Sequence, residues 1–398
     1  MASEERCANE PADFSLVLGG PLYQLWRRTR LAGAELQLVR RRVMVLTLLA
    51  WAPLLALSVA EGHAWGAGVK LSFLHDVELH VRLLVALPLL IVAELVFHEQ
   101  MRTVVMEFLE RGLIPDSQRL RFDAAIATAI RLRDSVAAEL VLLALVLIVG
   151  VGFIWRWQMS LDVSSWYGVP SAGRVHPSLA GWWLGFVSLP LFQFLLLRWY
   201  FRLFIWARFL WQVSRIPLRI VPTHPDLCGG IGFLARVGDA FSLLLLSQGA
   251  LLAGMMANKI FYVGARLPEF NMEIIALVAV LLLSVLGPLF VFSAKLMTAK
   301  RIGLREYGAL AQRYVREFER KWLRQGAPTG EPLMGSSDIQ SLADLRGGFE
   351  VVNDMRWVPF SLQSVVRLVV IALLPVAPLL LTMVSLRELV EALVKILF

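Results

Sequence analysis

Seven long apolar stretches constrain this chain more than any other feature, because a lipid bilayer is the one solvent that suits all of them. The clearest is EIIALVAVLLLSVLGPLFVFSAKL, which has no charged side chain between Glu273 and Lys295. About 20 apolar residues in a helix are enough to cross the hydrocarbon core. The predicted spans are 43–60, 80–98, 136–155, 179–206, 240–263, 273–295 and 362–384. The sequence therefore predicts an all-α, polytopic membrane helix bundle with about seven transmembrane helices and a small helical cytoplasmic layer.

The composition agrees with a membrane protein, since 58% of the residues are hydrophobic and 18% are charged. The net charge of +8 is spread over segments that flank the spans and forms no single patch. This distribution predicts contact with anionic membrane lipids and no binding of nucleic acid. Cys7 and Cys228 are the two cysteines, and both fall in segments predicted to be cytoplasmic, so no disulfide is expected. The first apolar run begins near Val43, behind a polar leader, and no signal peptide is expected.

Arginine and lysine gather in alternate connections, which predicts the orientation of the spans, because short basic loops stay in the cytoplasm. The residues that carry this signal are Arg27, Arg28, Arg30, Arg40, Arg41, Arg42, Arg102, Arg111, Arg119, Arg121, Arg131, Arg133, Arg208, Arg215, Arg219 and the basic run from Lys300 to Arg324. The N-terminus is therefore predicted to be cytoplasmic. Seven crossings would place the C-terminus outside. A re-entrant last segment, broken at Pro375 and Pro378, would return it to the cytoplasm, and both alternatives stay open.

We expect one membrane domain with four parts and no separate soluble domain. The parts are a cytoplasmic amphipathic leader over 1–42, a six-helix region over 43–296 with cytoplasmic connections 99–135 and 207–239, a cytoplasmic helical segment over 297–361, and a last transmembrane or re-entrant segment with a tail over 362–398.

Two helices are predicted to extend beyond the bilayer. The fourth span continues from Trp182 to Ile216, which is longer than any hydrocarbon core requires. The stretch Arg305 to Arg324 is amphipathic, with one apolar stripe formed by Tyr307, Leu310, Tyr314, Phe318 and Trp322. We expect this stripe to pack within the same chain; the alternatives are the membrane surface and a neighbouring subunit. A further helix is expected to begin after the Gly- and Pro-rich segment 326–337, where Ser337 and Gln340 have the spacing of a capping box.

Three of these segments resemble a group of uncharacterised bacterial multi-pass inner-membrane proteins with an HPDxxGGxGF-type cytoplasmic loop. The resemblance covers THPDLCGGIGFLARVGDAF (223–241), REYGALAQRYVREFERKWL (305–323) and GSSDIQSLADL (335–345), together with the ending LVKILF (393–398). It implies a bacterial inner (cytoplasmic) membrane location and transfers no catalytic residue.

The loop from His224 to Gly232 has the most unusual local chemistry. Asp226 can cap a helix or hold a cation, and the glycines at 229, 230 and 232 allow successive amides to point to one side and bind an anion. The spacing matches neither a phosphate-binding loop nor a dinucleotide fingerprint. The leading interpretation is a tight turn between the fourth and fifth spans. The alternative is a gating or ligand-sensing loop formed by His224, Asp226, Gly229, Gly230 and Gly232.

Charged residues inside the spans are the second group of candidates, because ionisable groups at membrane depth are costly and tend to mark pathways or paired contacts. Glu94, Glu139, Arg198, Arg202 and Arg367 all fall in the predicted cytoplasmic third. They are predicted either to share one polar vestibule or to form interhelical ion pairs. Pro375 and Pro378 join this group, because the apolar last span around them is able to gate a pore by dewetting.

No cofactor, metal or enzymatic activity is predicted. The cluster His75-Asp76-Val77-Glu78-Leu79-His80 contains possible ligands, but their spacing places them on different helix faces. Neither an HExxH nor a Gly-x-Ser-x-Gly sequence is present. The favoured hypothesis is a homo-oligomeric ion channel or transporter-like pore. The alternative is a membrane scaffold or signalling protein that binds a cytoplasmic protein partner through 208–239 and 297–360.

Overall fold

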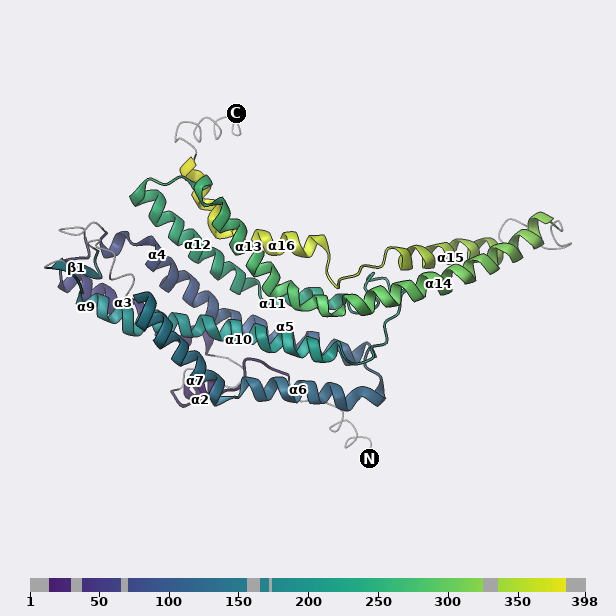
Figure 1. Ribbon diagram of the computed structural model, residues 1–398, viewed down its shortest axis with the longest axis horizontal. Coiled ribbons are helices and arrows are strands. Elements are labelled where there is room, and N and C mark those ends of the chain that lie inside the picture. Colours follow the sequence, from purple (N-terminus) through teal and green to yellow (C-terminus); the bar gives the residue numbers. More distant parts are fainter. Residues whose placement is uncertain are drawn as a thin grey trace.

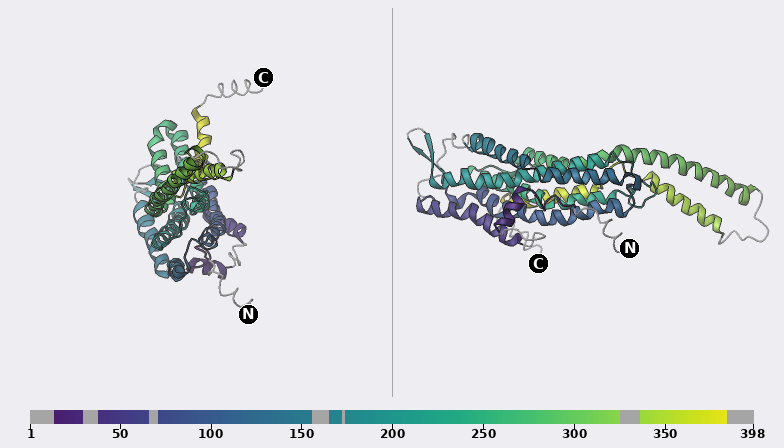
Figure 2. Two further views of the ribbon diagram at one scale, coloured as in Figure 1. Left: turned by 90° about the vertical axis from the view of Figure 1, so that its right-hand side faces the viewer. Right: turned by 90° about the horizontal axis from the view of Figure 1, so that it is seen from below.

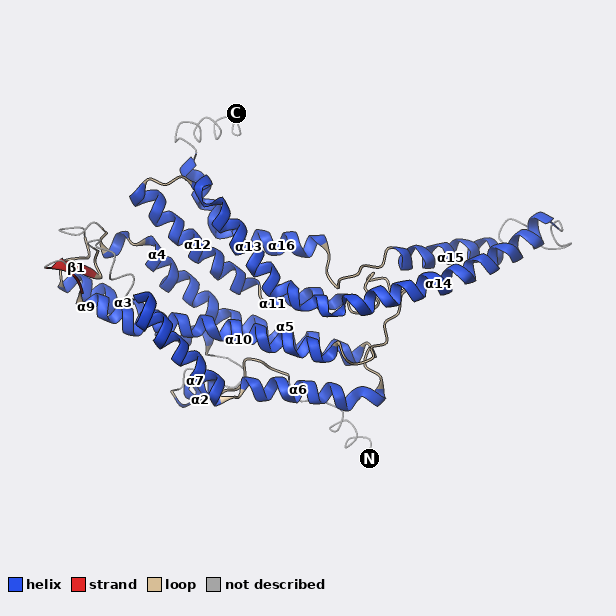
Figure 3. Ribbon diagram, viewed as in Figure 1, coloured by secondary structure: helices blue, strands red, loops and turns tan. Residues whose placement is uncertain are grey.

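The computed structural model describes residues 14–29, 38–65, 71–155, 165–171, 174–324 and 336–383. Helices dominate this part of the chain, and its strands form one short hairpin (Figure 3). The hairpin consists of β1 (Gly168–Ser171) and β2 (Arg174–Pro177), which are antiparallel with Val169 opposite His176. The prediction of an all-α bundle is confirmed.

Six helical stretches in the described part of the chain are long and apolar enough to cross a membrane. They are α3 (Val39–Ala60); Val77–Glu110, made of α4 (Val77–His80), η3 (Val81–Ala86) and α5 (Leu87–Glu110); Leu179–Val213, made of α9 (Leu179–Trp183), η6 (Leu184–Ser188) and α10 (Leu189–Val213); α12 (Ser242–Val263); Leu267–Arg324, made of η8 (Leu267–Phe270), α13 (Asn271–Leu286), η9 (Gly287–Phe292), α14 (Ser293–Phe318) and η10 (Glu319–Arg324); and Leu362–Met383, made of α16 (Leu362–Leu373) and η11 (Leu374–Met383). The chain is a multi-pass membrane protein.

The predicted third span is the exception among the seven. It forms α7 (Val136–Leu145) and the π-helical η5 (Val146–Trp155), but its apolar part, Val136–Gly150, is shorter than the other six. α7 has no buried side chain, although α10 packs beside it. This helix therefore lies at the edge of the bundle. Its apolar length supports a membrane crossing less than that of the other six stretches does.

The long helices run side by side along the longest dimension of the molecule (Figure 1). We call the end that carries β1 and β2 the hairpin end, and the opposite end the arm end. Beyond the arm end, α14 and α15 (Ser337–Asn353) project together as a two-helix arm, which Figure 2 shows from below. At the rise of an α-helix, the 58 residues of Leu267–Arg324 have a length along the helix axis of about 87 Å. The hydrocarbon core of a bilayer is about 30 Å thick, so most of this length exceeds what a single crossing needs.

The arm is held together by contacts inside the chain, which confirms the preferred expectation for the aromatic stripe. The Tyr314 hydroxyl donates to the carbonyl of Asp338 at 2.8 Å, and the Trp322 indole N–H donates to its carboxylate at 3.0 Å. Leu310 departs from the pattern, since it is 49% exposed. The predicted capping box is wrong, because the helix starts one residue earlier than expected and its N-cap is Ser336 instead of Ser337. The Ser336 side chain makes no capping hydrogen bond to the first turn.

Small residues on α12 allow two neighbouring helices to approach closely, as their spacing suggests. A Cβ atom on Gly249 would lie 1.9 Å from the carbonyl oxygen of Ala372 in α16. On another side of the helix, a Cβ atom on Gly254 would lie 3.1 Å from Val81. Both partners belong to the same chain, so this small-residue surface is used inside the protomer.

The last span is a continuous helix as far as it is described. α16 passes directly into the 3₁₀-helical η11, which contains Pro375 and Pro378. Proline has no backbone N–H to donate in either type of helix, so Pro375 and Pro378 each remove one backbone hydrogen bond from this segment. The segment is nonetheless not interrupted up to Met383, and it changes from α-helix to 3₁₀-helix at Leu374, directly before Pro375. Residues 384–398 lie outside the described part of the chain, so the spanning and re-entrant alternatives both stay predictions.

Two further elements, one helix and the leader, pack on the long helices. α6 (Arg119–Arg133) packs along α10 through a buried face that includes Phe122 and Ile126. In the leader, Phe14 and Trp26 are buried, and Trp26 belongs to the short helix α2 (Pro21–Arg28). The described part of the leader is thus packed into the core.

Candidate functional site

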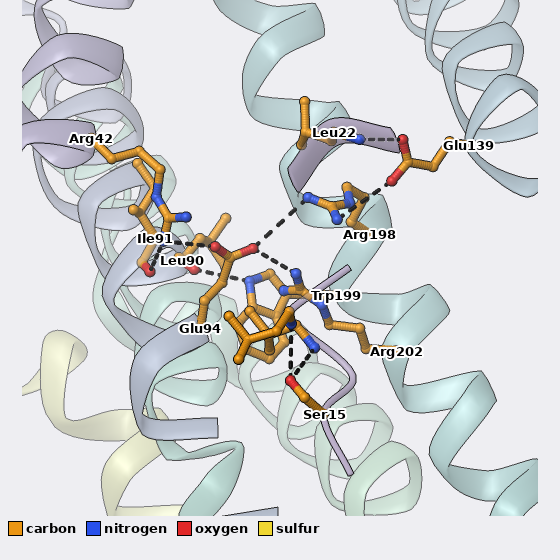
Figure 4. A network of polar contacts seen from close by, with 12 residues as sticks. Ser15, Leu22, Arg42, Leu90, Ile91, Glu94, Glu139, Arg198, Trp199 and Arg202 are labelled. Atoms are coloured by element: carbon orange, nitrogen blue, oxygen red, sulfur yellow. Dashed lines mark hydrogen bonds and ion pairs between the residues drawn. The ribbon is translucent and has the colours of Figure 1, made fainter. Parts of the chain in front are cut away.

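Glu94 is the centre of a buried charge cluster that joins three long helices. Its carboxylate, on α5, lies 2.8 Å from the Arg42 guanidinium of α3 and 2.6 Å from that of Arg202 on α10. Arg198 is one turn before Arg202, and its Nη1 is 3.9 Å from the same carboxylate. Figure 4 shows Glu94 between Arg42 on one side and the two α10 arginines on the other. We call Arg42, Glu94, Arg198 and Arg202 the Glu94 cluster.

A second carboxylate connects this cluster to the leader. Arg198 Nη2 lies 3.4 Å from Glu139, in the first turn of α7. The other oxygen of Glu139 accepts the backbone N–H of Leu22, in α2, at 2.9 Å. The Trp26 ring then covers the cluster, with the guanidinium carbons of Arg42 and Arg198 at 4.3 and 5.6 Å from its centroid. Five helices meet here: α2, α3, α5, α7 and α10.

The cluster is closed to solvent and carries an excess of positive charge. The side chains of Glu94 and Arg202 are 3% and 4% exposed, and that of Arg198 is 8% exposed. Three guanidinium groups face two carboxylates, and Arg198 Nη1 and Arg202 Nη1 have no hydrogen-bond partner among the described residues. A buried charge that loses its partner is strongly destabilising, so the cluster holds α3, α5 and α10 in one relative position.

Four of the predicted vestibule residues therefore meet, and Arg367 lies apart from them. Arg367 is 64% exposed on α16, and its Nη1 is 2.9 Å from Asp239 of α11 (Val237–Ala240). Pro375 and Pro378 lie further along the same helical segment. Sequence reasoning missed Arg42 and Trp26. In the run Arg40-Arg41-Arg42, the rotation of the helix about its axis decides which arginine points inward. The three residues are identical in type, so the sequence does not distinguish the inward one.

The loop from His224 to Gly232 is organised around Asp226. Oδ1 of Asp226 accepts the backbone N–H groups of Cys228 and Gly230 at 2.8 and 3.1 Å, and Oδ2 accepts that of Gly232 at 2.9 Å. His224 Nδ1 is 2.9 Å from Oδ1. The amides that were expected to face an anion thus face a carboxylate of the same loop. Asp226 satisfies them from within the chain.

The loop is also fixed to its surroundings, and glycine is required at its tightest point. Gly229 has φ +64°, and a Cβ atom there would lie 2.1 Å from Ile220 Cγ2. The carbonyl of Leu227 accepts the backbone N–H of Arg356 at 2.7 Å, from the connection between α15 and α16. Cys228 is fully buried beside Val358. These contacts give the loop a positional role between α10 and the last membrane helix.

Two side chains of this loop have altered proton affinity. Burial favours the neutral form of Asp226, but the three backbone N–H donors and His224 outweigh it and lower the pKa of this carboxyl. Burial, reinforced by the nearby charge of Asp226, raises the pKa of the Cys228 thiol to about 11. Cys228 is therefore a neutral, packed thiol at physiological pH.

Replacing Asp226 by asparagine is expected to destabilise the protein by about 2 kcal/mol at neutral pH, because the amide N–H₂ would face a backbone donor. Since the pKa of Asp226 is lowered by folding, its stabilisation is present above the ordinary value of 3.8 and is lost as the pH falls through the lower folded value. Thermal unfolding of wild type and Asp226→Asn in detergent across a pH series measures this loss of stability. The deficit of Asp226→Asn should shrink at the acid end, whereas the exposed arm variant Glu317→Gln should show none; a deficit independent of pH would contradict the assignment.

Within the described ranges, no group of three or more histidine, cysteine, aspartate or glutamate side chains is placed to hold a metal ion. The cluster around His75 uses Asp76 instead as a hydrogen-bond acceptor for the Trp166 indole, at 3.0 Å, and for the Asn258 amide, at 2.9 Å. A comparison with known protein families, curated proteins and solved structures found no match.

Proposed function

We propose that the protein is a homo-oligomeric pore for ions or small solutes, whose path follows the exposed face of α16 between copies of the chain. The observation that carries this proposal is Arg367, which is 64% exposed on a helix long enough to cross the membrane. A guanidinium is costly against lipid tails. A water-filled path between copies would solvate it, and its positive charge would favour anions at the mouth of that path.

The exposed face of α16 and η11 has the composition of a gated path. Its exposed positions are Leu362, Gln363, Val366, Arg367, Val370, Leu374, Ala377, Pro378, Leu380, Leu381, Thr382 and Met383. Leu368 and Ala372, on the opposite face, are buried against the bundle. Gln363 and Arg367 thus lie near the start of the helix, and the exposed side chains from Val370 to Leu381 are apolar. An apolar constriction of this kind can stop ion flow by losing its water.

The Glu94 cluster supports a path between copies rather than through one protomer. Glu94 is fully engaged by three arginines, and the buried Trp26 ring covers the cluster. Opening a route here would separate a buried carboxylate from its partners, which is strongly unfavourable. The charges that remain accessible on a membrane helix are therefore the better candidates for lining a path.

We infer a bacterial inner-membrane location with the N-terminus and the arm in the cytoplasm, and no enzymatic role. The distribution of arginines supports this orientation, because α6 and the arm carry many of them at the arm end. Fusing a fluorescent protein that matures only in the cytoplasm to the N-terminus tests the orientation. Fluorescence is expected, and its absence from a correctly inserted fusion would contradict it.

Ion flux through purified protein in sealed liposomes tests the pore. We expect flux with KCl to exceed flux with potassium gluconate, and Arg367→Glu to lower the chloride-dependent flux by about tenfold, because it reverses the charge at the mouth. The matched control is Arg208→Glu, which alters another exposed arginine, on α10. Absence of flux from an intact, inserted oligomer would contradict the pore, and an equal loss in both variants would contradict the role of Arg367.

The projecting arm favours protein binding as a second candidate function. Its exposed apolar side chains include Ile302, Leu310, Leu323 and Ile339, which are 42%, 49%, 71% and 42% exposed. Exposed apolar groups on an element outside the membrane suit a cytoplasmic partner. The liposome experiment separates the candidates, since a scaffold would conduct no ions whatever the charge of residue 367.

A further inference from the structure

A cavity of about 320 Å³ lies between α5 and the segment that precedes α12, toward the arm end. It is lined by Glu99, Gln100, Thr103, Val104, Arg236 and Asp239. Its volume is at the lower limit of small-molecule sites, which begin at about 300 Å³. The Glu94 cluster does not use this cavity, and the pore proposal meets it only at Asp239, the partner of Arg367.

The hydrogen-bond acceptors of the cavity are available. Glu99 has no ion pair among the residues that the structure describes. Gln100 Oε1 is shielded from solvent and accepts no hydrogen bond there. The Thr103 hydroxyl donates a hydrogen bond to the carbonyl of Glu99 at 3.2 Å, which leaves the lone pairs of the hydroxyl oxygen free to accept. Glu99 and Thr103 are exposed to the open side of the cavity, whereas the Gln100 oxygen is buried, and a buried acceptor without a donor is unfavourable until a ligand or water supplies one.

The positive groups around the cavity, by contrast, are already engaged. The Arg236 guanidinium forms an ion pair with Glu107, one turn beyond Thr103 on α5. Asp239 is paired with Arg367 through Oδ1 at 2.9 Å. Among the residues that the structure describes, the charge of Glu99 is therefore the uncompensated one, and these residues give the cavity a net negative, acceptor-rich lining.

We propose that this cavity binds a primary ammonium group. An ammonium nitrogen carries one positive charge and three N–H donors, which match the carboxylate of Glu99, the Oε1 atom of Gln100 and the hydroxyl oxygen of Thr103. Two carboxylates line the cavity, fewer acidic ligands than an all-protein divalent-cation site normally uses. The ammonium group can belong to a free amine or to an ethanolamine lipid headgroup, because the cavity lies near one end of a membrane-crossing helix.

Titration of the detergent-purified full chain with ethanolamine, followed by calorimetry, tests the free-amine source. Choline is the matched ligand control, since it has the same charge and no N–H donor. We expect ethanolamine to bind and choline to bind at least about tenfold more weakly, and Glu99→Gln to weaken ethanolamine binding by about tenfold. Glu110→Gln changes an exposed acid at the end of the same helix and should leave binding unchanged.

Native mass spectrometry with phosphatidylethanolamine and phosphatidylcholine of identical acyl chains tests the lipid source. Retention of the ethanolamine lipid over the choline lipid, reduced by Glu99→Gln, identifies the headgroup as the ligand. If neither ethanolamine nor its lipid binds in preference to the choline counterpart, or if Glu99→Gln leaves both unchanged, the site is not an ammonium site. These measurements require no ion flux, so their outcome is independent of the pore proposal.

Discussion

Replacing Glu94 by glutamine is expected to destabilise the protein by about 3–5 kcal/mol, the cost of removing one partner from a buried ion cluster. The substitution keeps the size of the side chain and removes the charge that neutralises Arg42 and Arg202, which lie 2.8 and 2.6 Å from the carboxylate. Three guanidinium groups would then depend on Glu139 alone. We expect a large fall in the temperature at which the detergent-purified protein loses its monodisperse peak.

Glu110→Gln is the matched control, because it makes the same chemical change on the same helix at an exposed position that no described residue pairs with. Its thermal stability should remain close to that of the wild type. A double variant that also replaces Arg202 by methionine should recover part of the loss, since it removes one of the unneutralised charges. Equal stability of Glu94→Gln and wild type would show that the cluster is hydrated and does not hold the helices together.

Replacing Gly249 by alanine should destabilise the protein by about 3 kcal/mol, at the upper end of the range for overpacked interiors. The added methyl group would lie 1.9 Å from the carbonyl oxygen of Ala372, and a backbone atom cannot rotate away from it. α12 and α16 would have to separate, which would also shift Arg367 and the exposed face of the last span. Thermal unfolding and the liposome assay should both detect the change.

Gly287→Ala serves as the comparison for Gly249→Ala, since its nearest neighbour, a flexible Leu283 side-chain atom, is 3.4 Å from the added Cβ. That substitution should be neutral or slightly stabilising, because alanine favours helix more than glycine by up to about 1 kcal/mol. If both variants unfold at the wild-type temperature, the close contact of α12 with α16 is looser than the structure shows.

The apolar stretches predicted the membrane helices well, because the length of a span is imposed by the bilayer and is visible in any window of sequence. The predicted spans 179–206 and 240–263 compare with observed helical stretches at Leu179–Val213 and Ser242–Val263. Helix ends were less predictable, as the cap at Ser336 shows, since adjacent serines compete for one position.

The partners of the charged residues could be predicted only in part. Position in the spans placed Glu94, Glu139, Arg198 and Arg202 at a similar depth, and the structure brings them together. Depth alone could not separate Arg367 from this group, because the rotation of α16 about its axis decides which side its arginine faces. The contribution of Trp26 was equally hidden, since the amphipathic pattern of the leader does not show which part of the bundle it packs against.

The Glu94 cluster also has a consequence for the order in which the chain enters the membrane. Arg42 and Glu94 belong to the first two long helices, so their charges can pair as soon as this hairpin leaves the insertion machinery. α10 arrives much later and brings two arginines at once, with only the remaining oxygen of Glu94 and Glu139 to receive them. A chain that stops before α10 should therefore enter the bilayer with its Arg42–Glu94 pair already neutral, and α10 completes the cluster afterwards.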